Sequence, residues 1–249
     1  MSSKRLLREF VRSVISEAAV SVADATSRDM AMYIDSEVRE KSVVLYDATK
    51  AKEEMLSLIS RLDAAEESEQ EIDVWREFEK AMQESVVGIV RIVPNRYACH
   101  HSWYVSNVAA EKGFGPLMYD IAFSLARTLT PDRQNVTPKA RGIWQRIDST
   151  GATASSEVEA LPLDDIDDPK TPPPEDDCQL HNDPVLDKAY RAKDPIDTTP
   201  LAAKHKEFRV WMLATFKKHY VSNLTFSNAL QSASTVFFSN KYWDATIGT

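Results

Sequence analysis

The chain has 249 residues, 43% of them hydrophobic, and its formal net charge at pH 7 is −8. This hydrophobic content is enough for one large domain or for a core domain with appendages. The negative charge argues against a general nucleic-acid binder, because such a protein needs a basic face. No apolar run approaches the roughly twenty residues that span a bilayer. Cys99 and Cys178 are the only cysteines, which predicts no disulfide framework and suits a reducing cytoplasm.

Residues 1–20 predict an appended amphipathic helix. Its apolar side chains recur at helical spacing, and basic residues crowd its start. Charged residues interrupt the apolar stretch, so it is not a signal peptide. The pattern is typical of a helix that lies on a membrane or docks on a partner, and also of a helix packed on its own domain. The apolar face comprises Leu6, Leu7, Phe10, Val11, Val14 and Ile15.

From residue 28 to residue 148 the pattern is that of an α+β core. Met30–Ile34 and Ser42–Tyr46 favour extended structure and predict a hairpin. Val86–Val93 is the clearest strand, and a turn at residues 95–96 makes it antiparallel to a further strand at Cys99–Val108. Two helices are expected between the hairpin and this pair of strands. Their buried side chains are Met55, Leu58, Ile59 and Leu62 in Asp47–Leu62, followed by Trp75, Phe78 and Met82.

The segment Cys99–Leu117 predicts a strand, a glycine turn and the start of a helix. Gly113 and Gly115 allow positive φ or a close backbone approach. Pro116 suits the first helical position, because its missing N–H would have no partner there. Free amides and the helix dipole make such a turn an anion site. The alternative is an ordinary tight β–α turn, since lone Gly-x-Gly turns are common.

A second helix start follows a loop that contains Asp132 and Arg133. Thr137 is suited to the N-cap of this helix and Pro138 to its first position. Asp132 and Arg133 either shape an acceptor pocket or clamp an anion, or else they pair with each other or cap the helix.

Two of these motifs carry a resemblance to a known family. The glycine turn resembles motif A of the GNAT family of N-acetyltransferases, whose Arg/Gln-x-x-Gly-x-Gly/Ala loop cradles the coenzyme A pyrophosphate at a helix start. Thr137–Trp144 is similar to that family's Asn-x-x-Ala-x-x-Leu/Phe-Tyr helix. Over roughly Val86–Tyr190 the chain is more closely similar to bacteriophage-encoded acetyltransferase-like proteins. The motif A positions are Ala110, Glu111, Lys112, Gly113, Phe114 and Gly115.

The resemblance implies a mixed, mostly antiparallel sheet flanked by helices, with a site for acetyl-coenzyme A. The residues from Ala110 to Gly115 would bind the pyrophosphate, and the strand edge at Asn107–Val108 would pair with the pantetheine arm. An enzyme of this kind transfers acetyl to an amine, here an unknown one. His100 or His101 would serve as a base through water if either faces the cleft, Asp132 is the third candidate catalytic residue, and no metal is expected.

Two positions depart from the family pattern. Ala110 stands where the family usually has Arg or Gln, so one side-chain contact to phosphate is absent. Trp144 stands where many members have the Tyr that protonates the departing thiolate. An indole N–H donates a hydrogen bond but is no proton-transfer acid. The alternative function is therefore a catalytically inactive GNAT-fold protein that serves as a binding or virion structural component.

Residues 149–200 form an acidic, proline-rich segment. Pro162, Pro169 and Pro172–Pro174 argue against a regular helix or a central strand. Such a segment cannot build its own core, so it is either a linker or an extended strap laid on the domain, and the resemblance favours the strap. In the last segment, residues 201–249, a helix is expected at Lys206–Tyr220. Its aromatic-rich tail would finish the core or meet a partner.

The phage resemblance also suggests where the protein acts. Phage head proteins often begin with short helical tags that a maturation protease cuts after Glu, and Ile15–Ala18 is similar to such a site. The protein is expected in the host cytoplasm or associated with the virion. Its expected partners are coenzyme A, the amine acceptor and a phage structural or host protein.

A zinc site is the remaining metal hypothesis. Cys99 and His101 share one face of the expected strand, and Cys178 and His181 have the spacing of metal ligands. The two pairs are far apart in the sequence, and the second lies in the acidic segment. We therefore favour ordinary core or surface roles for all four residues.

Overall fold

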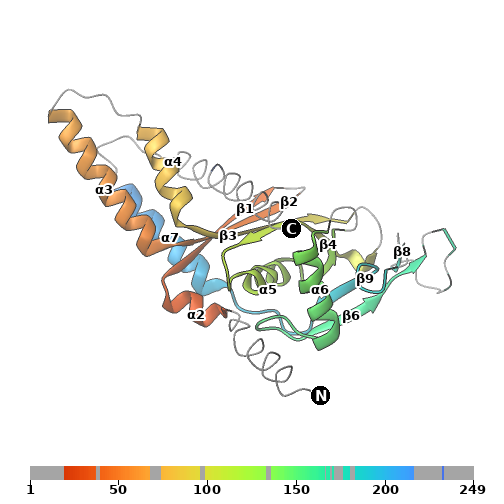
Figure 1. The fold of residues 1–249 in the computed structure, drawn as a ribbon. Helices are drawn as coiled ribbons and strands as arrows, with labels where there is room; N and C mark the ends of the chain where they lie inside the picture. Colours follow the sequence, from red (N-terminus) through yellow and green to blue (C-terminus); the bar gives the residue numbers. More distant parts are fainter. Residues whose placement is uncertain are drawn as a thin grey trace, which may run out of the picture.

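The structure, a computed structural model, describes residues 20–37, 40–67, 74–95, 99–132, 136–165, 167–168, 170, 176–179, 183–215 and 232. Within these residues the fold is α+β, with a seven-stranded, mixed and mostly antiparallel sheet flanked by helices (Figure 1). The expected fold class is confirmed at that level. The predicted N-terminal helix and the aromatic residues of the tail lie outside the described residues. No helix in the described part is long and apolar enough to cross a bilayer.

The strands follow the order β1-β2-β3-β4-β5-β9-β6 across the sheet. Neighbours in this described sheet run antiparallel except β4 and β5, which are parallel. A separate parallel ladder joins β7 (Asp164–Asp165) to β8 (Asp177–Gln179). The strands of the main sheet are β1 Met30–Glu37, β2 Glu40–Asp47, β3 Val86–Pro94, β4 Trp103–Ala110, β5 Thr128–Pro131, β6 Val158–Pro162 and β9 Lys188–Ala192.

The helices include both that were expected between the hairpin and β3. Their expected apolar faces are buried at Met55, Leu58, Leu62, Phe78 and Met82. Ile59 is half-buried, and the Trp75 side chain lies outside the described part of the structure. The helices are α2 Val22–Ser27, α3 Ala48–Glu67, α4 Val74–Ser85, α5 Gly115–Ala126, α6 Pro138–Thr150 and α7 Thr199–Thr215.

Alternation along β1 and β2 sends side chains to two separate cores, one on each face of the sheet. Met30 and Met32 join the core that contains buried residues of α5 and α6. Ala31, between them, joins the core of α3, α4 and α7. Phe208 and Met212 of α7 are buried in this second core. The sheet therefore holds α5 and α6 together on one face, where the candidate site lies.

The acidic segment contributes strands to the main sheet. β9 lies between β5 and β6, so it is an interior strand. The prediction that this segment holds no central strand is therefore wrong for Lys188–Ala192. The prolines that motivated the prediction all lie outside that run, and Pro162 ends β6, where the sheet has its edge.

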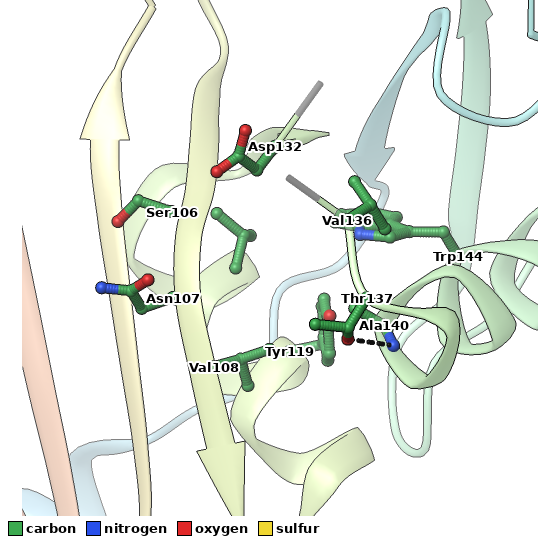
Figure 2. A pocket seen from close by; sticks show the side chains of 10 residues that line it. Ser106, Asn107, Val108, Tyr119, Asp132, Val136, Thr137, Ala140 and Trp144 are labelled. Atoms are coloured by element: carbon green, nitrogen blue, oxygen red, sulfur yellow. Dashed lines mark hydrogen bonds between the residues drawn. The ribbon is translucent and has the colours of Figure 1, made fainter. Parts of the chain in front are cut away.

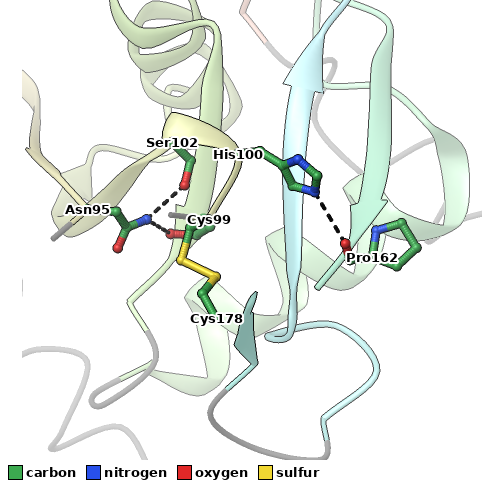
Figure 3. The surroundings of a disulfide bond; sticks show 7 residues. Asn95, Cys99, His100, Ser102, Pro162 and Cys178 are labelled. Atoms are coloured by element: carbon green, nitrogen blue, oxygen red, sulfur yellow. Dashed lines mark hydrogen bonds between the residues drawn. A yellow bond between two sulfur atoms is a disulfide. The ribbon is translucent and has the colours of Figure 1, made fainter. Parts of the chain in front are cut away.

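The expected strand at Cys99–Val108 is present only from Trp103 onward. Cys99, His100 and His101 form a 3₁₀ turn with φ values of 37°, 53° and 54°. This turn places Cys99 next to Cys178, and the two cysteines form a disulfide across a sequence separation of 79 residues (Figure 3). The prediction that the cysteines form no disulfide framework is therefore wrong, because sequence separation does not reveal which loops meet in the fold.

Candidate functional site

The candidate site opens where β4 and β5 part. Their parallel pairing covers only three residues of each strand and ends at Val105 and Pro131. Proline has no N–H to continue the ladder. Beyond this point β4 remains paired with β3. Within the described residues, the edge of β4 that faces α6 thus has unpaired backbone groups after Val105.

A β-bulge marks the same position on the other side of β4. Val105 is opposite Ile92 and Asn107 is opposite Arg91, which leaves Ser106 as the extra residue. Bulges bend a strand, and they occur frequently beside functional sites. Here the bulge and the end of the β5 ladder coincide, so β4 turns away from β5 at Ser106.

A cleft of about 400 Å³ lies between β4, beyond its pairing with β5, and α6 (Figure 2). Val105–Val108 line one wall, while Thr137, Ala140 and Trp144 line the wall formed by α6 and its N-cap. Tyr119 of α5 and Asp132, which follows β5, complete the lining. This volume falls within the range of small-molecule sites. Asn107, Val108 and Asp132, predicted from the sequence as site residues, therefore come together in one cleft.

The glycine turn lies beyond the end of β4 and begins α5. Gly113 has φ of 89°, a conformation that favours glycine. The Glu111 amide donates to Val87 O at 2.8 Å, and the Phe114 amide donates to Glu111 O at 3.1 Å. Gly113, Gly115 and Leu117, in contrast, donate no backbone hydrogen bond within the described chain.

These free amides are the first donors of α5. Phe114 at the N-cap makes no side-chain capping bond, so the helix start presents backbone N–H groups and the positive end of its dipole. A Cβ at Gly115 would lie 3.8 Å from Ile143 Cδ1 of α6, an ordinary contact. The turn can therefore accept an anion through its backbone.

Basic side chains of α6 flank this turn. Lys139 and Arg146 are four residues before and three residues after Ile143, which places them on the helix face that borders Gly115. Arg146 and Pro116 also line one small cavity. Both side chains are exposed, so they can add positive charge beside the free amides.

Trp144 and Tyr119 pack together at the inner side of the cleft. Both are about 1% exposed, and their ring centroids lie 5.1 Å apart in an edge-to-face arrangement. Trp144 also packs on Tyr190 at 5.1 Å, and the Tyr190 hydroxyl donates to Val185 O at 2.8 Å. The Tyr119 hydroxyl has no hydrogen-bond partner in the described structure. Burial raises the pKa of Tyr119 above its usual value, so this hydroxyl remains protonated.

The three candidate catalytic residues lie in different places. His100 is half-buried, with Nε2 3.3 Å from the carbonyl oxygen of Pro162 at the end of β6 (Figure 3). His101 is exposed on the same turn. Neither histidine lines the cleft, whereas Asp132 does. Asp132 is therefore the one of the three that the fold brings to the cleft.

Sequence reasoning missed two buried polar residues of α5, Tyr119 and Asp120. The Thr153 hydroxyl donates to Asp120 Oδ1, and Asp120 Oδ2 has no partner among the described residues. Burial raises the pKa of Asp120 to about 6. The available signal was a Tyr–Asp pair within the otherwise apolar run of α5.

The cysteines of the zinc hypothesis are joined to each other. Cys99 and Cys178 are buried with Leu163 and Ala189 in a small core of their own. As a disulfide they offer no thiolate to a metal. The described residues contain no group of three or more His, Cys, Asp or Glu side chains placed to hold a metal ion, and His181 lies outside them.

The geometry of the cleft and turn must be interpreted without a characterised relative. No protein-family model matches the chain, and no curated protein or solved structure matches it. Function is therefore inferred from the residues of the cleft and the glycine turn, together with the motifs described above.

Proposed function

We propose that the protein binds acetyl-coenzyme A in this cleft and is a GNAT-like N-acetyltransferase of phage origin. The proposal is carried by the parting of β4 and β5 at Val105 and Pro131, together with the free amides at the start of α5, the helix that follows β4. These features suit an extended ligand that has an anionic centre and an arm with amide groups. The anionic centre would bind at the helix start, and the arm would lie along the free edge of β4. Coenzyme A has such an anionic centre, its pyrophosphate, and such an arm, its pantetheine.

The backbone supplies most of the proposed contacts. The amides of Gly113, Gly115 and Leu117 would donate to the pyrophosphate. The free edge of β4 at Asn107–Val108 would pair with amides of the pantetheine arm, in the manner of an added strand. All of these residues except Leu117 are among those that the motif resemblance indicates.

Nearby basic side chains would compensate for the missing Arg or Gln at the position of Ala110. Ala110 pairs with Gly88 in the sheet and offers no charged group. Lys112 in the turn, and Lys139 and Arg146 on the adjacent face of α6, are exposed basic side chains. Each lost charge-assisted hydrogen bond costs about 1.5–3 kcal/mol, so these three residues would limit the loss of affinity.

For catalysis the cleft offers Asp132 as its acidic side chain. The bound thioester supplies the acetyl group. The Asp132 carboxylate would attract the ammonium form of the acceptor, which loses one proton to solvent and becomes a nucleophilic amine. Asp132 would then accept the second proton as the nitrogen bonds to the acetyl carbon. The carbon–sulfur bond breaks and the thiolate takes a proton from water, because Trp144 has no acidic proton to give.

The alternative proposal is a GNAT-fold binding or virion component without catalysis. Trp144 favours it, because this indole is packed between Tyr119 and Tyr190 and has no acidic proton to transfer. The enzyme proposal requires both binding of acetyl-coenzyme A and turnover, whereas the alternative predicts no turnover.

Release of free coenzyme A thiol from acetyl-coenzyme A, measured with a panel of amines, decides between them. The enzyme proposal expects amine-dependent thiol release that falls about a hundredfold or more in Asp132→Asn and is unchanged in Glu53→Gln, an exposed substitution on α3. Binding without amine-dependent release would favour the inactive protein.

A further inference from the structure

The Tyr119 hydroxyl is a buried donor that has no partner among the described residues. Its ring lines the cleft beneath β4, and its oxygen is shielded from solvent. In Figure 2 the side chain rises from α5 between β4 and the start of α6. Buried hydroxyls nearly always have a hydrogen-bond partner, and leaving one without a partner destabilises the fold.

Tyr190 shows how the same core satisfies such a group. It packs on the other side of Trp144, and its hydroxyl donates to Val185 O at 2.8 Å. Both tyrosines pack on Trp144, and both side chains are almost fully buried. Among the described residues, only the Tyr190 hydroxyl has a hydrogen-bond partner. The missing partner of Tyr119 therefore calls for an acceptor from outside the described chain.

We propose that the Tyr119 hydroxyl donates a hydrogen bond to a carbonyl oxygen of the acyl-pantetheine arm bound in the cleft. This inference deepens the proposed function and rests on it. A tyrosine O–H donates one hydrogen bond, so an acceptor atom of the ligand can satisfy it. The arm carries amide carbonyls and, when acylated, a thioester carbonyl, so it has acceptors of the required kind.

The position of Tyr119 suits this role. Tyr119 is one helical turn beyond Gly115, so the pyrophosphate site and the hydroxyl belong to the same side of α5. The edge of β4 would bind the arm from one side, and Tyr119 would contact it from α5. The ligand carbonyl exchanges its bond to water for this bond, and the arm takes the place of the atoms that shield the hydroxyl, so the gain in affinity is that of an ordinary protein hydrogen bond.

The test compares Tyr119→Phe with wild type, and Tyr190→Phe serves as the matched control. Thermal unfolding without ligand should show Tyr119→Phe as stable as wild type or more stable, because the variant removes an unsatisfied group. Tyr190→Phe should unfold at a lower temperature, because it leaves Val185 O unpaired. Calorimetric titration should show about tenfold weaker binding for Tyr119→Phe and wild-type binding for Tyr190→Phe.

Titration with both coenzyme A and acetyl-coenzyme A identifies the acceptor. Weaker binding of both ligands to Tyr119→Phe supports a bond to an amide carbonyl of the arm, and weaker binding of acetyl-coenzyme A alone supports a bond to the thioester carbonyl. If wild type and Tyr119→Phe bind both ligands equally, the inference is overturned and the proposed function stands. If wild type binds neither ligand, the proposed function fails and this inference fails with it.

Discussion

Cys99 and Cys178 form a disulfide that ties the turn before β4 to the acidic segment that returns as β9. The bond is buried, with Cys99 at 1% and Cys178 at 0% exposure. Next to it, the Asn95 side-chain amide donates to the hydroxyls of Ser102 and Thr130 at 2.8 Å and 3.0 Å. The start of β4 is therefore fixed to both β5 and the acidic segment, close to where the cleft opens.

Removing the disulfide should lower stability. A bond that closes a loop across 79 residues constrains the unfolded chain, and its loss costs about 2–4 kcal/mol. Urea unfolding of Cys99→Ala/Cys178→Ala against the oxidised wild type measures this loss. A reducing agent should destabilise wild type and leave the double variant unchanged. Equal stability of both proteins with and without the reducing agent would show that the pairing contributes nothing.

A second prediction concerns the close approach of α5 to β3. A Cβ at Gly88 would lie 2.7 Å from Met118 Sδ and 3.2 Å from its Cγ, and Met118 is fully buried. Gly88→Ala should therefore destabilise the fold by about 1–3 kcal/mol through overpacking. Gly142→Ala is the control, since a Cβ there meets nothing within 4 Å and helix propensity favours alanine.

Denaturant unfolding of both glycine variants checks this contrast. If α5 packs closely on β3, Gly88→Ala should lose stability. Gly142→Ala should instead gain up to about 1 kcal/mol from helix propensity. A Gly88→Ala protein as stable as wild type would mean that Met118 moves aside at no cost.

The pH dependence of the free energy of unfolding should reveal the ionisation of the buried Asp120 carboxyl group. Its folded pKa is raised from 3.8 to about 6 by burial, so ionisation is harder in the folded than in the unfolded state. Stability therefore falls as pH rises from about 4 to 6 and stays lower above that window. A shift of this size corresponds to a loss of about 3 kcal/mol.

Asp120→Asn isolates this effect. The amide keeps an oxygen to accept the Thr153 hydroxyl but does not ionise. Urea unfolding at pH 7 and at pH 4 should show the variant gaining on wild type at pH 7, with a smaller difference at pH 4. A difference that is independent of pH would contradict the raised pKa.

Local signals in the sequence predicted much of the site. Thr137 caps α6 as expected, since its hydroxyl accepts from the Ala140 amide at 3.2 Å. The strand, glycine turn and helix between Trp103 and Ala126 also follow the predicted order. These features depend on residues close in sequence, where turn chemistry and capping act directly.

Features that depend on the tertiary fold were not predictable in this way. The disulfide requires that the acidic segment return to the sheet, which neither cysteine indicates. His100, His101 and Asp132 were all candidates, and of these only Asp132 lines the cleft, where β4 and β5 part. The unpartnered hydroxyl of Tyr119 depends on the packing of α5 against α6, and helical spacing alone suggests only a core residue.

Calorimetric titration with acetyl-coenzyme A of wild type, Gly115→Val and Gly142→Val tests the central claim most directly. A Cβ at Gly115 would make only an ordinary contact within the fold, 3.8 Å from Ile143 Cδ1, but a β-branched residue there would block an approaching pyrophosphate. We expect saturable binding to wild type and Gly142→Val, and none to Gly115→Val. Identical titration of wild type and Gly115→Val, or no binding to wild type at millimolar ligand, would contradict coenzyme binding at the glycine turn.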